Sequence, residues 1–572
     1  MKITKRKSIP AKSLFLIKIS ILLHALCVAQ ARPGITHVVV IGIDGLSSNG
    51  FKSASTPCMD SLRNAGAYSY TVRSVLPTSS KPNWNAMICG AGPEATGTID
   101  ESWRSGVTNF PYTSLDNHKR FPNIFNVIRM QNPRAEIGAV YDWSGFGDLL
   151  NKEQLNYWAA CETQREVAEK AVAYIQEKSP HFLFIHFDNP DHLGHSIGFM
   201  SPEYIKAVEE TDSDVKLVID GINSSSMAAN TMVLVVSDHG GIANTHGGTS
   251  YEEFNTPIIF SGKGIKKNYL IKQQIYKYDV AANICFALGL KVPQVWTGRA
   301  NKSAFEGFEE PGNIWQGGTV LPPPYFSTKK IIAPYGGLFV DTSAIVNIQL
   351  PVGATGQIRY TLDGSNPNRK SLLYTTPFVL NRSAIVTAAV FNESDRSTFV
   401  KAEYRVAKSD SNRGLNYFIY HLDSNVNSLP DFDRLKPVYA ATCFELGVSD
   451  PENGIAERTV SQSLNTFKSG TGVRFSGWIQ IDEDGVYNFS LWSTGASKLF
   501  IGSELVVNNN NNASQHRGNG GMVYLKKGFF PVKLDLFYNG KSERVLLHAG
   551  YGSNNIVQKI IPPEKFFKKK PR

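Results

Sequence analysis

The chain has 572 residues, which is too many for one hydrophobic core and predicts two to four domains. Hydrophobic residues make up 42% and charged residues 19%, a balance that is typical of folded soluble proteins and excludes a largely disordered chain. The formal net charge is +10, but six basic residues lie in the acid-free residues 1–31, so the rest carries +4 (10 − 6). This small excess argues against strong attraction to a polyanion, and we expect no nucleic-acid polymer among the partners.

Residues 1–31 resemble a secretory signal peptide. Basic residues precede an apolar stretch at residues 14–28, and Ala29-Gln30-Ala31 gives the small-x-small pattern of a cleavage site. The alternative is an uncleaved membrane anchor. No later segment has the roughly 18 consecutive apolar residues that a spanning helix needs, so we expect no transmembrane segment in the mature chain. The sequence therefore predicts an exported protein that is secreted, periplasmic or held at the cell surface.

Residues 32–320 alternate between strand-like and helix-like patterns. Three short apolar runs, rich in β-branched and aromatic residues, predict strands buried on both faces of a sheet: residues 37–43, 182–187 and 232–236. Residues 163–178 have the apolar spacing of a helix, and Thr163 and Glu166 stand at capping-box spacing at its start. The fold class predicted for this domain is therefore α/β with a mainly parallel central sheet.

The proline run at residues 322–324 predicts a linker, and the helical pattern ends there. Residues 325–407 show strand patterns with a turn at residues 363–367, and residues 413–567 continue in the same manner. We therefore expect two all-β modules, sandwiches or barrels, after the α/β domain.

Polar residues follow each of the three predicted strands of the α/β domain. Because the carboxyl ends of parallel strands meet at one edge of a sheet, we expect these side chains to lie close together. Carboxylates and imidazoles are good ligands for zinc and similar metals. The candidate ligands come in three groups along the chain: Asp44; Asp191 and His195; and Asp238, His239 and His246.

A serine-rich loop supplies the candidate nucleophile. Ser80 lies in the stretch LPTSSKPNW at residues 76–84. Ordinary serine catalysis needs a histidine base, whereas a bound metal can deprotonate the hydroxyl and make that base unnecessary. Taken alone, the stretch is better explained as a serine-rich loop without chemistry.

Five motifs together resemble the alkaline phosphatase superfamily, and most of all its type I phosphodiesterase/nucleotide pyrophosphatase branch. They occur in the family order: GIDG at 42–45, PTSSKPN at 77–83, GPEATG at 92–97, DHLGH at 191–195 and SDHG at 237–240. The resemblance implies an alkaline-phosphatase-like metallohydrolase domain that binds two Zn²⁺ ions per chain. It assigns one ion to Asp191, His195 and His246, and the other to Asp44, Asp238, His239 and the oxygen of Ser80.

The resemblance also implies the reaction. Ser80 stands at the position of the family nucleophile, so it would attack phosphorus and form a phosphoseryl intermediate that water then hydrolyses. Lys81 and Asn83 are expected to contact the non-bridging oxygens. The sequence departs from the family at Glu101, where nucleotide pyrophosphatases carry a substrate-binding asparagine. The expected substrate is a small-molecule or glycan-linked phosphoester, with a phosphodiester as the first choice.

The two β modules carry their own resemblances. Residues 358–367 resemble the small β-sandwich found at the C-terminus of chitobiases. Motifs at residues 429–432, 475–479 and 484–489 resemble a PA14 domain. Some PA14 domains bind glycans through calcium held by paired aspartates, and residues 492–497 lack such a pair. The resemblance implies a spacer or a contact with a cell-surface glycan or a protein.

Three alternative functions remain open at this point. A sulfatase needs Cys or Ser followed by x-Pro-x-Arg, and Ser80-Lys81-Pro82-Asn83 is followed by Trp84 instead of arginine. A phosphomonoesterase of the same superfamily would keep the nucleophile and the metals. A catalytically degenerate, glycan-binding surface protein is the third alternative, although all the proposed ligands and Ser80 are present.

Overall fold

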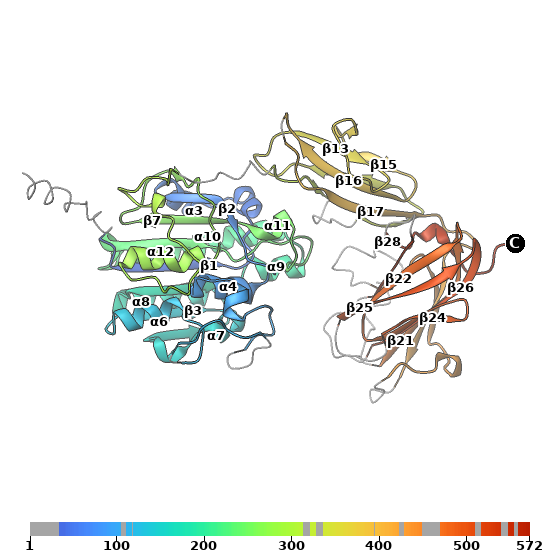
Figure 1. Ribbon diagram of the computed structural model, residues 1–572, viewed down its shortest axis with the longest axis horizontal. Coiled ribbons are helices and arrows are strands. Elements are labelled where there is room, and N and C mark those ends of the chain that lie inside the picture. The colour runs from blue at the N-terminus through green and yellow to red at the C-terminus, as the bar shows by residue number, and fades with distance from the viewer. Residues whose placement is uncertain are drawn as a thin grey trace, which may run out of the picture.

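The computed structural model shows an α/β domain followed by two β modules (Figure 1). It describes residues 34–104, 110–116, 118–312, 321–327, 336–393, 395–422, 428–448, 470–509, 516–538, 547–553 and 559–572. The predicted signal peptide, residues 1–31, lies outside the described residues. Within the described ranges, no helix combines the length and the hydrophobicity that crossing a membrane requires.

An eight-stranded sheet forms the centre of the α/β domain, with the order β4-β3-β5-β1-β6-β7-β2-β8. The first five strands in this order are parallel, and β7 runs antiparallel to both of its neighbours. The strands are β1 (His37–Ile43), β2 (Ala67–Arg73), β3 (Ile137–Tyr141), β4 (Tyr157–Ala160), β5 (Phe182–Phe187), β6 (Thr231–Val236), β7 (Asn255–Gly262) and β8 (Tyr269–Leu270). The predicted mainly parallel sheet is confirmed.

The sheet is buried on both faces because successive apolar side chains of its strands point alternately into two hydrophobic cores. In β1, Val38 and Val40 belong to the core under α4, α6 and α12, whereas Val39 and Ile41 belong to the core under α8 and α10. Each such buried side chain contributes about 1.5–3 kcal/mol. The helices are α2 (Ser48–Ser53), α3 (Pro57–Asn64), α4 (Ser80–Cys89), α5 (Pro93–Thr96), α6 (Ile124–Gln131), α7 (Ser144–Leu149), α8 (Gln164–Lys178), α9 (Asp191–Ser196), α10 (Pro202–Asn223), α11 (Tyr251–Phe254) and α12 (Asp279–Leu288).

Helix α8 begins where the sequence predicts, but its N-terminal cap differs from the predicted capping box by one hydrogen bond. Thr163 Oγ1 accepts a hydrogen bond from the N–H of Glu166 at 3.2 Å, as expected of an N-cap residue. In a capping box, the carboxylate of Glu166 would accept from the N–H of Thr163. Instead it accepts from the N–H of Glu162, at 3.0 Å. The carboxylate therefore ties the helix to the incoming chain.

Both modules that follow are all-β, as predicted. The first has a five-stranded sheet, β10-β17-β16-β13-β14, and two short strand pairs. The second is a sandwich, because strands β21 and β26 of one sheet and β22 and β27 of the other share one core. The first module contains β9 (Tyr325–Phe326), β10 (Gly336–Val340), β11 (Ala344–Val346), β12 (Ile348–Gln349), β13 (Gln357–Thr361), β14 (Leu372–Leu373), β15 (Phe378–Leu380), β16 (Ala384–Phe391) and β17 (Val400–Ala407). The second contains β18 (Leu415–His421), β19 (Tyr439–Cys443), β20 (Gly447–Val448), β21 (Thr471–Ile481), β22 (Gly485–Thr494), β23 (Ala496–Ile501), β24 (Glu504–Asn508), β25 (His516–Leu525), β26 (Gly528–Tyr538), β27 (Leu547–Gly552), β28 (Lys559–Ile560) and β29 (Phe566–Phe567).

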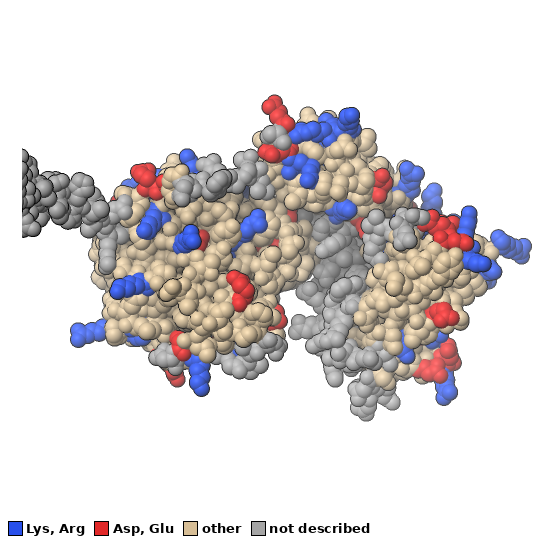
Figure 2. Space-filling model, in the orientation of Figure 1, with Lys and Arg blue, Asp and Glu red and all other residues tan. Residues whose placement is uncertain are grey.

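The two β modules meet through a small buried contact. Leu338 and Ala407 of the first module pack with Phe444 of the second. Beside them, Arg405 Nε lies 3.2 Å from Glu445 Oε2, and these side chains are only 3% and 9% exposed. On the face shown in Figure 2, acidic and basic side chains are interspersed over the described surface.

Candidate active site

Three neighbouring parallel strands deliver the predicted metal ligands to one edge of the sheet. Strand β1 pairs with β5 on one side and with β6 on the other. Asp44 follows β1, Asp191 begins α9 after β5, and Asp238 follows β6. We call the six predicted protein ligands the Asp/His cluster: Asp44, Asp191, His195, Asp238, His239 and His246.

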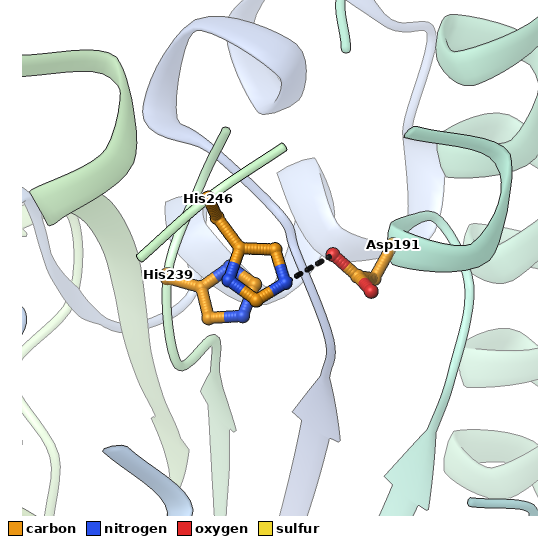
Figure 3. A group of neighbouring side chains, drawn as sticks. All are labelled: Asp191, His239 and His246. Carbon is orange, nitrogen blue, oxygen red and sulfur yellow. Dashed lines mark ion pairs between the residues drawn. The ribbon is translucent and has the colours of Figure 1, made fainter. Parts of the chain in front are cut away.

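Two groups within the cluster bring ligand atoms from three residues to within 4.8 Å of one another: Asp44, Asp238 and His239; and Asp191, His239 and His246. Figure 3 shows the second group, in which the rings of His239 and His246 stack with centroids 3.7 Å apart beside Asp191. His239 belongs to both groups, so the grouping differs from the expected one, which placed His195 with Asp191 and His246. His195 Nε2 nevertheless lies 3.3 Å from Asp191 Oδ2.

Each imidazole of the cluster is oriented by a backbone carbonyl. The Nδ1 atoms of His195, His239 and His246 lie 2.9, 2.9 and 3.0 Å from the carbonyl oxygens of Asn244, Gly240 and Thr78. A carbonyl oxygen only accepts hydrogen bonds, so each Nδ1 carries the hydrogen. Each Nε2 therefore presents its lone pair to the cluster, which is the form in which imidazole binds a metal.

Two of these lone pairs face each other. His195 Nε2 and His246 Nε2 are 2.9 Å apart, a distance at which two lone pairs repel unless a proton or another cation lies between them. Burial, followed by the neighbouring charge of His239, lowers the pKa of His246 to about 4. A proton is therefore a poor occupant at neutral pH, and the arrangement fits a metal cation.

The carboxylates of the cluster point to the same conclusion. Asp44 Oδ1, Asp191 Oδ1 and Asp238 Oδ2 are buried and have no hydrogen-bond donor among the described residues. Leaving a charged oxygen in this state costs about 1–3 kcal/mol or more. Burial, followed by the charge of Asp191, raises the pKa of Asp238 to about 6, and burial and the charges of Asp238 and Asp191 raise that of Asp44. A cation would supply the missing partner, so the donor set fits a metal such as zinc.

Ser80 lies beside the cluster at the start of α4. Its Oγ is 3.0 Å from His239 Nε2, and its side chain is buried. Asn83 fixes the preceding loop, because its side-chain oxygen accepts from the N–H of Val75 and its amide donates to the carbonyls of Pro77 and Ser79. The amide of Asn83 thus supports the loop that aims Ser80 at the cluster. Its expected contact with substrate oxygens stays a prediction.

Lys81 and Glu101 lie next to Ser80. The Lys81 ammonium is buried, 2.8 Å from Asp148 Oδ2 and 3.1 Å from the carbonyl oxygen of Trp103. Glu101 Oε1 accepts from the N–H of Lys81 at 3.1 Å. Burial raises the pKa of Glu101, and the charge of Asp238 adds to the effect, so this carboxyl is within electrostatic range of the cluster. The expected contact of Lys81 with substrate also stays a prediction, and its ammonium is paired with Asp148.

Two residues that contact the cluster were missed by the sequence analysis in this role. Trp84 Nε1 donates to Asp44 Oδ2 at 2.8 Å, and His186 Nε2 lies 3.2 Å from the same oxygen. In the sequence, Trp84 stood out only as the residue that replaces an arginine. A usable signal for His186 was its position as the one polar residue in the run FLFIHF of β5.

The fold and the site together define an α/β domain with a candidate metal centre at its strand ends. Residues 38–257 match the family model described as type I phosphodiesterase/nucleotide pyrophosphatase, residues 348–404 match Fn3 associated, and residues 411–565 match the PA14 domain. The chain thus carries a type I phosphodiesterase/nucleotide pyrophosphatase domain followed by a PA14 domain. The model that matches the middle module is Fn3 associated, where the sequence suggested a chitobiase C-terminal-like sandwich.

Curated relatives match about a third of this chain. Human ectonucleotide pyrophosphatase/phosphodiesterase family member 1 is 25% identical over 196 residues, which cover 32% of this chain and 21% of that protein. Venom phosphodiesterase 2 of Crotalus adamanteus is 24% identical over 217 residues, 36% of this chain and 26% of that protein. The chain therefore spans about a quarter of the length of these relatives. A solved structure of murine ectonucleotide pyrophosphatase/phosphodiesterase 5 covers 45% of this chain and 96% of its own, at 15% identity and a TM-score of 0.39.

Proposed function

We propose that this protein is an exported, metal-dependent phosphodiesterase that acts through Ser80 and a phosphoseryl intermediate. The observation that carries the proposal is the position of Ser80 Oγ, 3.0 Å from His239 Nε2, beside carboxylate oxygens that have no hydrogen-bond donor within the described part of the chain. The membership of the α/β domain in the phosphodiesterase/nucleotide pyrophosphatase family supports hydrolysis of a phosphoric ester.

The Asp/His cluster and Ser80 would hold two Zn²⁺ ions per chain. When bound, such ions lower the pKa of a hydroxyl or a water and stabilise negative charge on phosphoryl oxygens. The chain supplies the orientation, because the backbone carbonyls described above fix each imidazole and the loop held by Asn83 fixes Ser80. His239 contacts Ser80 through the Nε2 that faces both groups, which links the nucleophile to the cluster.

The residues of the site would have different roles in the reaction. The Ser80 oxygen forms a bond to phosphorus while the bond from phosphorus to the leaving alcohol breaks, and water later cleaves the phosphoserine. The N-terminus of α4, where Ser80 is the first residue, favours negative charge on the phosphoryl group. Lys81 and Asn83 are the proposed contacts to its non-bridging oxygens, although both side chains have partners within the protein.

The charge near Ser80 favours a diester over a monoester. The carboxyl of Glu101 accepts from the N–H of Lys81, next to Ser80, and when ionised it would add negative charge near the phosphoryl group. A monoester carries up to two negative charges and a diester carries one, so the monoester is repelled more strongly. Trp84 occupies the position where a sulfatase motif needs an arginine. Its side chain is fully buried and donates a hydrogen bond to Asp44.

The proposed setting is outside the cytoplasm, with the protein secreted, periplasmic or at the cell surface. The apolar segment and small-x-small site within residues 1–31 support export. We propose that the PA14 domain contacts a cell-surface glycan or a protein and keeps the α/β domain near a small-molecule or glycan-linked phosphoester.

The test compares three aryl esters that share one leaving group: a phosphodiester, a phosphomonoester and a sulfate. We expect the purified protein to hydrolyse the phosphodiester with the highest kcat/KM. Ser80→Ala should lower it by on the order of 10⁴-fold or more and abolish the acid-trapped phosphoenzyme, with metal content unchanged. Ser79→Ala is the matched control, because Ser79 precedes α4 and makes no side-chain capping bond.

Each other outcome assigns the protein differently. Fastest turnover of the sulfate ester would overturn phosphoester hydrolysis. Fastest turnover of the monoester would keep Ser80 as the nucleophile and make the protein a phosphatase. A trapped phosphoenzyme that survives Ser80→Ala would place the nucleophile elsewhere. The absence of turnover on all three esters would favour the glycan-binding alternative.

A further inference from the structure

We propose that Trp84 and His186 are positioning residues that hold the carboxylate of Asp44 so that one oxygen faces the metal centre. The inference rests on the proposed role of Asp44 as a metal ligand. It assigns a purpose to two buried polar groups that the reaction itself does not use.

The two oxygens of Asp44 have different surroundings. Oδ2 is 2.8 Å from Trp84 Nε1 and 3.2 Å from His186 Nε2, so two N–H groups from different elements converge on it. Oδ1 has no hydrogen-bond donor among the described residues and lies 3.6 Å from His239 Nε2. Because two donors hold one oxygen, the carboxylate cannot rotate freely, and the other oxygen stays aimed at the cluster.

The indole of Trp84 reaches Asp44 through space that a glycine leaves open. A Cβ atom at Gly42, two residues before Asp44 in β1, would lie 2.7 Å from the ring of Trp84. Helix α4 therefore packs its tryptophan directly on the strand that carries the ligand. The same helix begins with Ser80, so the contact also couples the position of the nucleophile to that of Asp44.

His186 packs against aromatic rings, and a carboxylate lies near its Nδ1. Its ring stacks on Phe146 and Trp143, with centroid distances of 4.9 and 5.9 Å, and it meets Trp84 edge-on. Its Nδ1 lies 3.6 Å from Oδ1 of Asp142, at the end of β3. Asp142, His186 and Asp44 thus lie in a row from β3 through β5 to β1, and the packing of the ring against Phe146, Trp143 and Trp84 holds its Nε2 towards Asp44.

Such hydrogen bonds to ligating groups usually contribute 10–100-fold to metal affinity, by holding the ligand in one orientation. If Trp84 and His186 only packed in the hydrophobic core, they would contribute to stability without any effect on metal binding. A positioning role and a packing role therefore predict different metal affinities for variants of Trp84 and His186. Both roles predict a loss of thermal stability, so only the metal affinity distinguishes them.

The experiment uses the full-length protein loaded with Zn²⁺. Trp84→Phe keeps an aromatic ring and removes the N–H, and His186→Leu removes the second donor. Each should raise the Zn²⁺ concentration for half-saturation by roughly 10–100-fold in a competition titration with a coloured chelator. Excess Zn²⁺ should restore most of kcat. His186→Gln retains an N–H near Nε2 and should retain an affinity close to that of the wild type.

Trp296→Phe is the matched control, because its buried indole N–H donates to the Pro122 carbonyl, away from the cluster. It should lower the melting temperature without changing the half-saturation concentration. Unchanged zinc affinity in both Trp84→Phe and His186→Leu would overturn the inference, and so would equal losses in His186→Gln and His186→Leu. A wild-type protein that binds no Zn²⁺ would instead refute the proposed metal site itself, so the two failures are distinguishable.

Discussion

The buried charges at the strand ends of the α/β domain are paired differently from those of the two β modules. In the β modules, the buried carboxylate of Glu445 faces Arg405, and Asp535 receives two hydrogen bonds from Arg474, at 2.6 and 2.8 Å. At the strand ends of the α/β domain, three carboxylates and three imidazoles converge instead, and no arginine or lysine among the described residues forms an ion pair with the three carboxylates.

This difference separates structural charges from functional ones. A buried charge with a hydrogen-bonded counter-ion is balanced inside the fold, so it needs nothing further. A buried carboxylate oxygen without a donor is balanced only when something else binds. The difference supports the proposal that the chemistry takes place at the Asp/His cluster, and it predicts that equivalent substitutions in the two regions have different consequences.

Between the two regions, the largest difference is expected from matched aspartate substitutions. Asp238→Asn removes a charge from the cluster, so it should lower metal content and reduce kcat/KM on an aryl phosphodiester by on the order of 10³-fold or more. Asp535→Asn should leave both quantities within about twofold, because it changes only the pair with Arg474. Elemental analysis and steady-state kinetics measure the two outcomes.

Full activity in metal-free protein, prepared with a chelator and checked by elemental analysis, would refute this prediction. A similar loss of activity in both variants would show that the PA14 domain and the cluster are coupled, which would remove the distinction between the two regions.

The second prediction concerns the stability of the buried pair in the β modules. Arg405→Met leaves Glu445 buried without its counter-ion, so it should lower the free energy of unfolding by about 3–5 kcal/mol. The double variant Arg405→Met/Glu445→Leu should recover most of this loss, because no charge then stays buried alone. Denaturant unfolding followed by tryptophan fluorescence provides the measurement.

Turnover of a small ester should be unaffected in both of these variants, since neither residue lies in the α/β domain. A double variant as unstable as the single one would show that the pair is needed for the packing of the module junction rather than for charge balance.

The third prediction uses pH to compare two buried glutamates. Burial, followed by the charge of Glu253, raises the pKa of Glu252 from 4.5 to about 7. A carboxyl whose folded pKa is raised favours the fold while it is protonated, so its contribution to stability is lost as the pH rises from about 4.5 through about 7. Glu252→Gln should therefore be more stable than the wild type at pH 8, by up to roughly 3 kcal/mol, and equally stable at pH 4.

Glu445→Gln is the matched control. Burial raises the pKa of Glu445 as well, but Arg405 opposes the shift, so this substitution leaves the guanidinium buried without its counter-ion. It should destabilise the protein at pH 8. Stabilisation by Glu445→Gln, or its absence in Glu252→Gln, in melting curves across this pH range would contradict the comparison.

The sequence predicted much of the α/β fold because its signals were local. The apolar runs that became β1, β5 and β6 end at Asp44, Asp191 and Asp238, and parallel pairing brings such ends together. These local patterns do not predict which side chains from distant segments contact each other. The salt bridge of Lys81 with Asp148 joins residues 67 positions apart in the chain, so no local pattern indicated that this ammonium had a partner inside the protein.

The position of His239 between two groups was unpredictable for a related reason. The family resemblance implied that each metal had its own histidines, but the path of the loop between His239 and His246 stacks the two rings. His186 was missed because a single histidine in an apolar strand looks like a core residue, and only the position of Asp44 reveals what it contacts.

Only a small effect on turnover of a small soluble ester is expected from removing the β modules altogether. The two cores of the α/β domain contain only buried residues between Ile35 and Phe308, whereas those of the modules begin at Phe326. The Asp/His cluster, Ser80, Trp84 and His186 all lie before α12. A protein that ends at residue 320 should therefore hydrolyse a small soluble ester within about threefold of the full-length rate, because a domain with its own core folds independently.

The same truncation also tests what the modules contribute. If the PA14 domain holds the enzyme near a surface-attached phosphoester, turnover of that substrate should fall by about 10²-fold or more, because the effective concentration is lost. A truncated protein that is folded by circular dichroism but inactive on the small ester would show that the modules complete the site. Equal rates on soluble and surface-attached substrates would mean that the modules do not localise the enzyme, so the different treatment of charge in the two regions would reflect only structural stability in the modules.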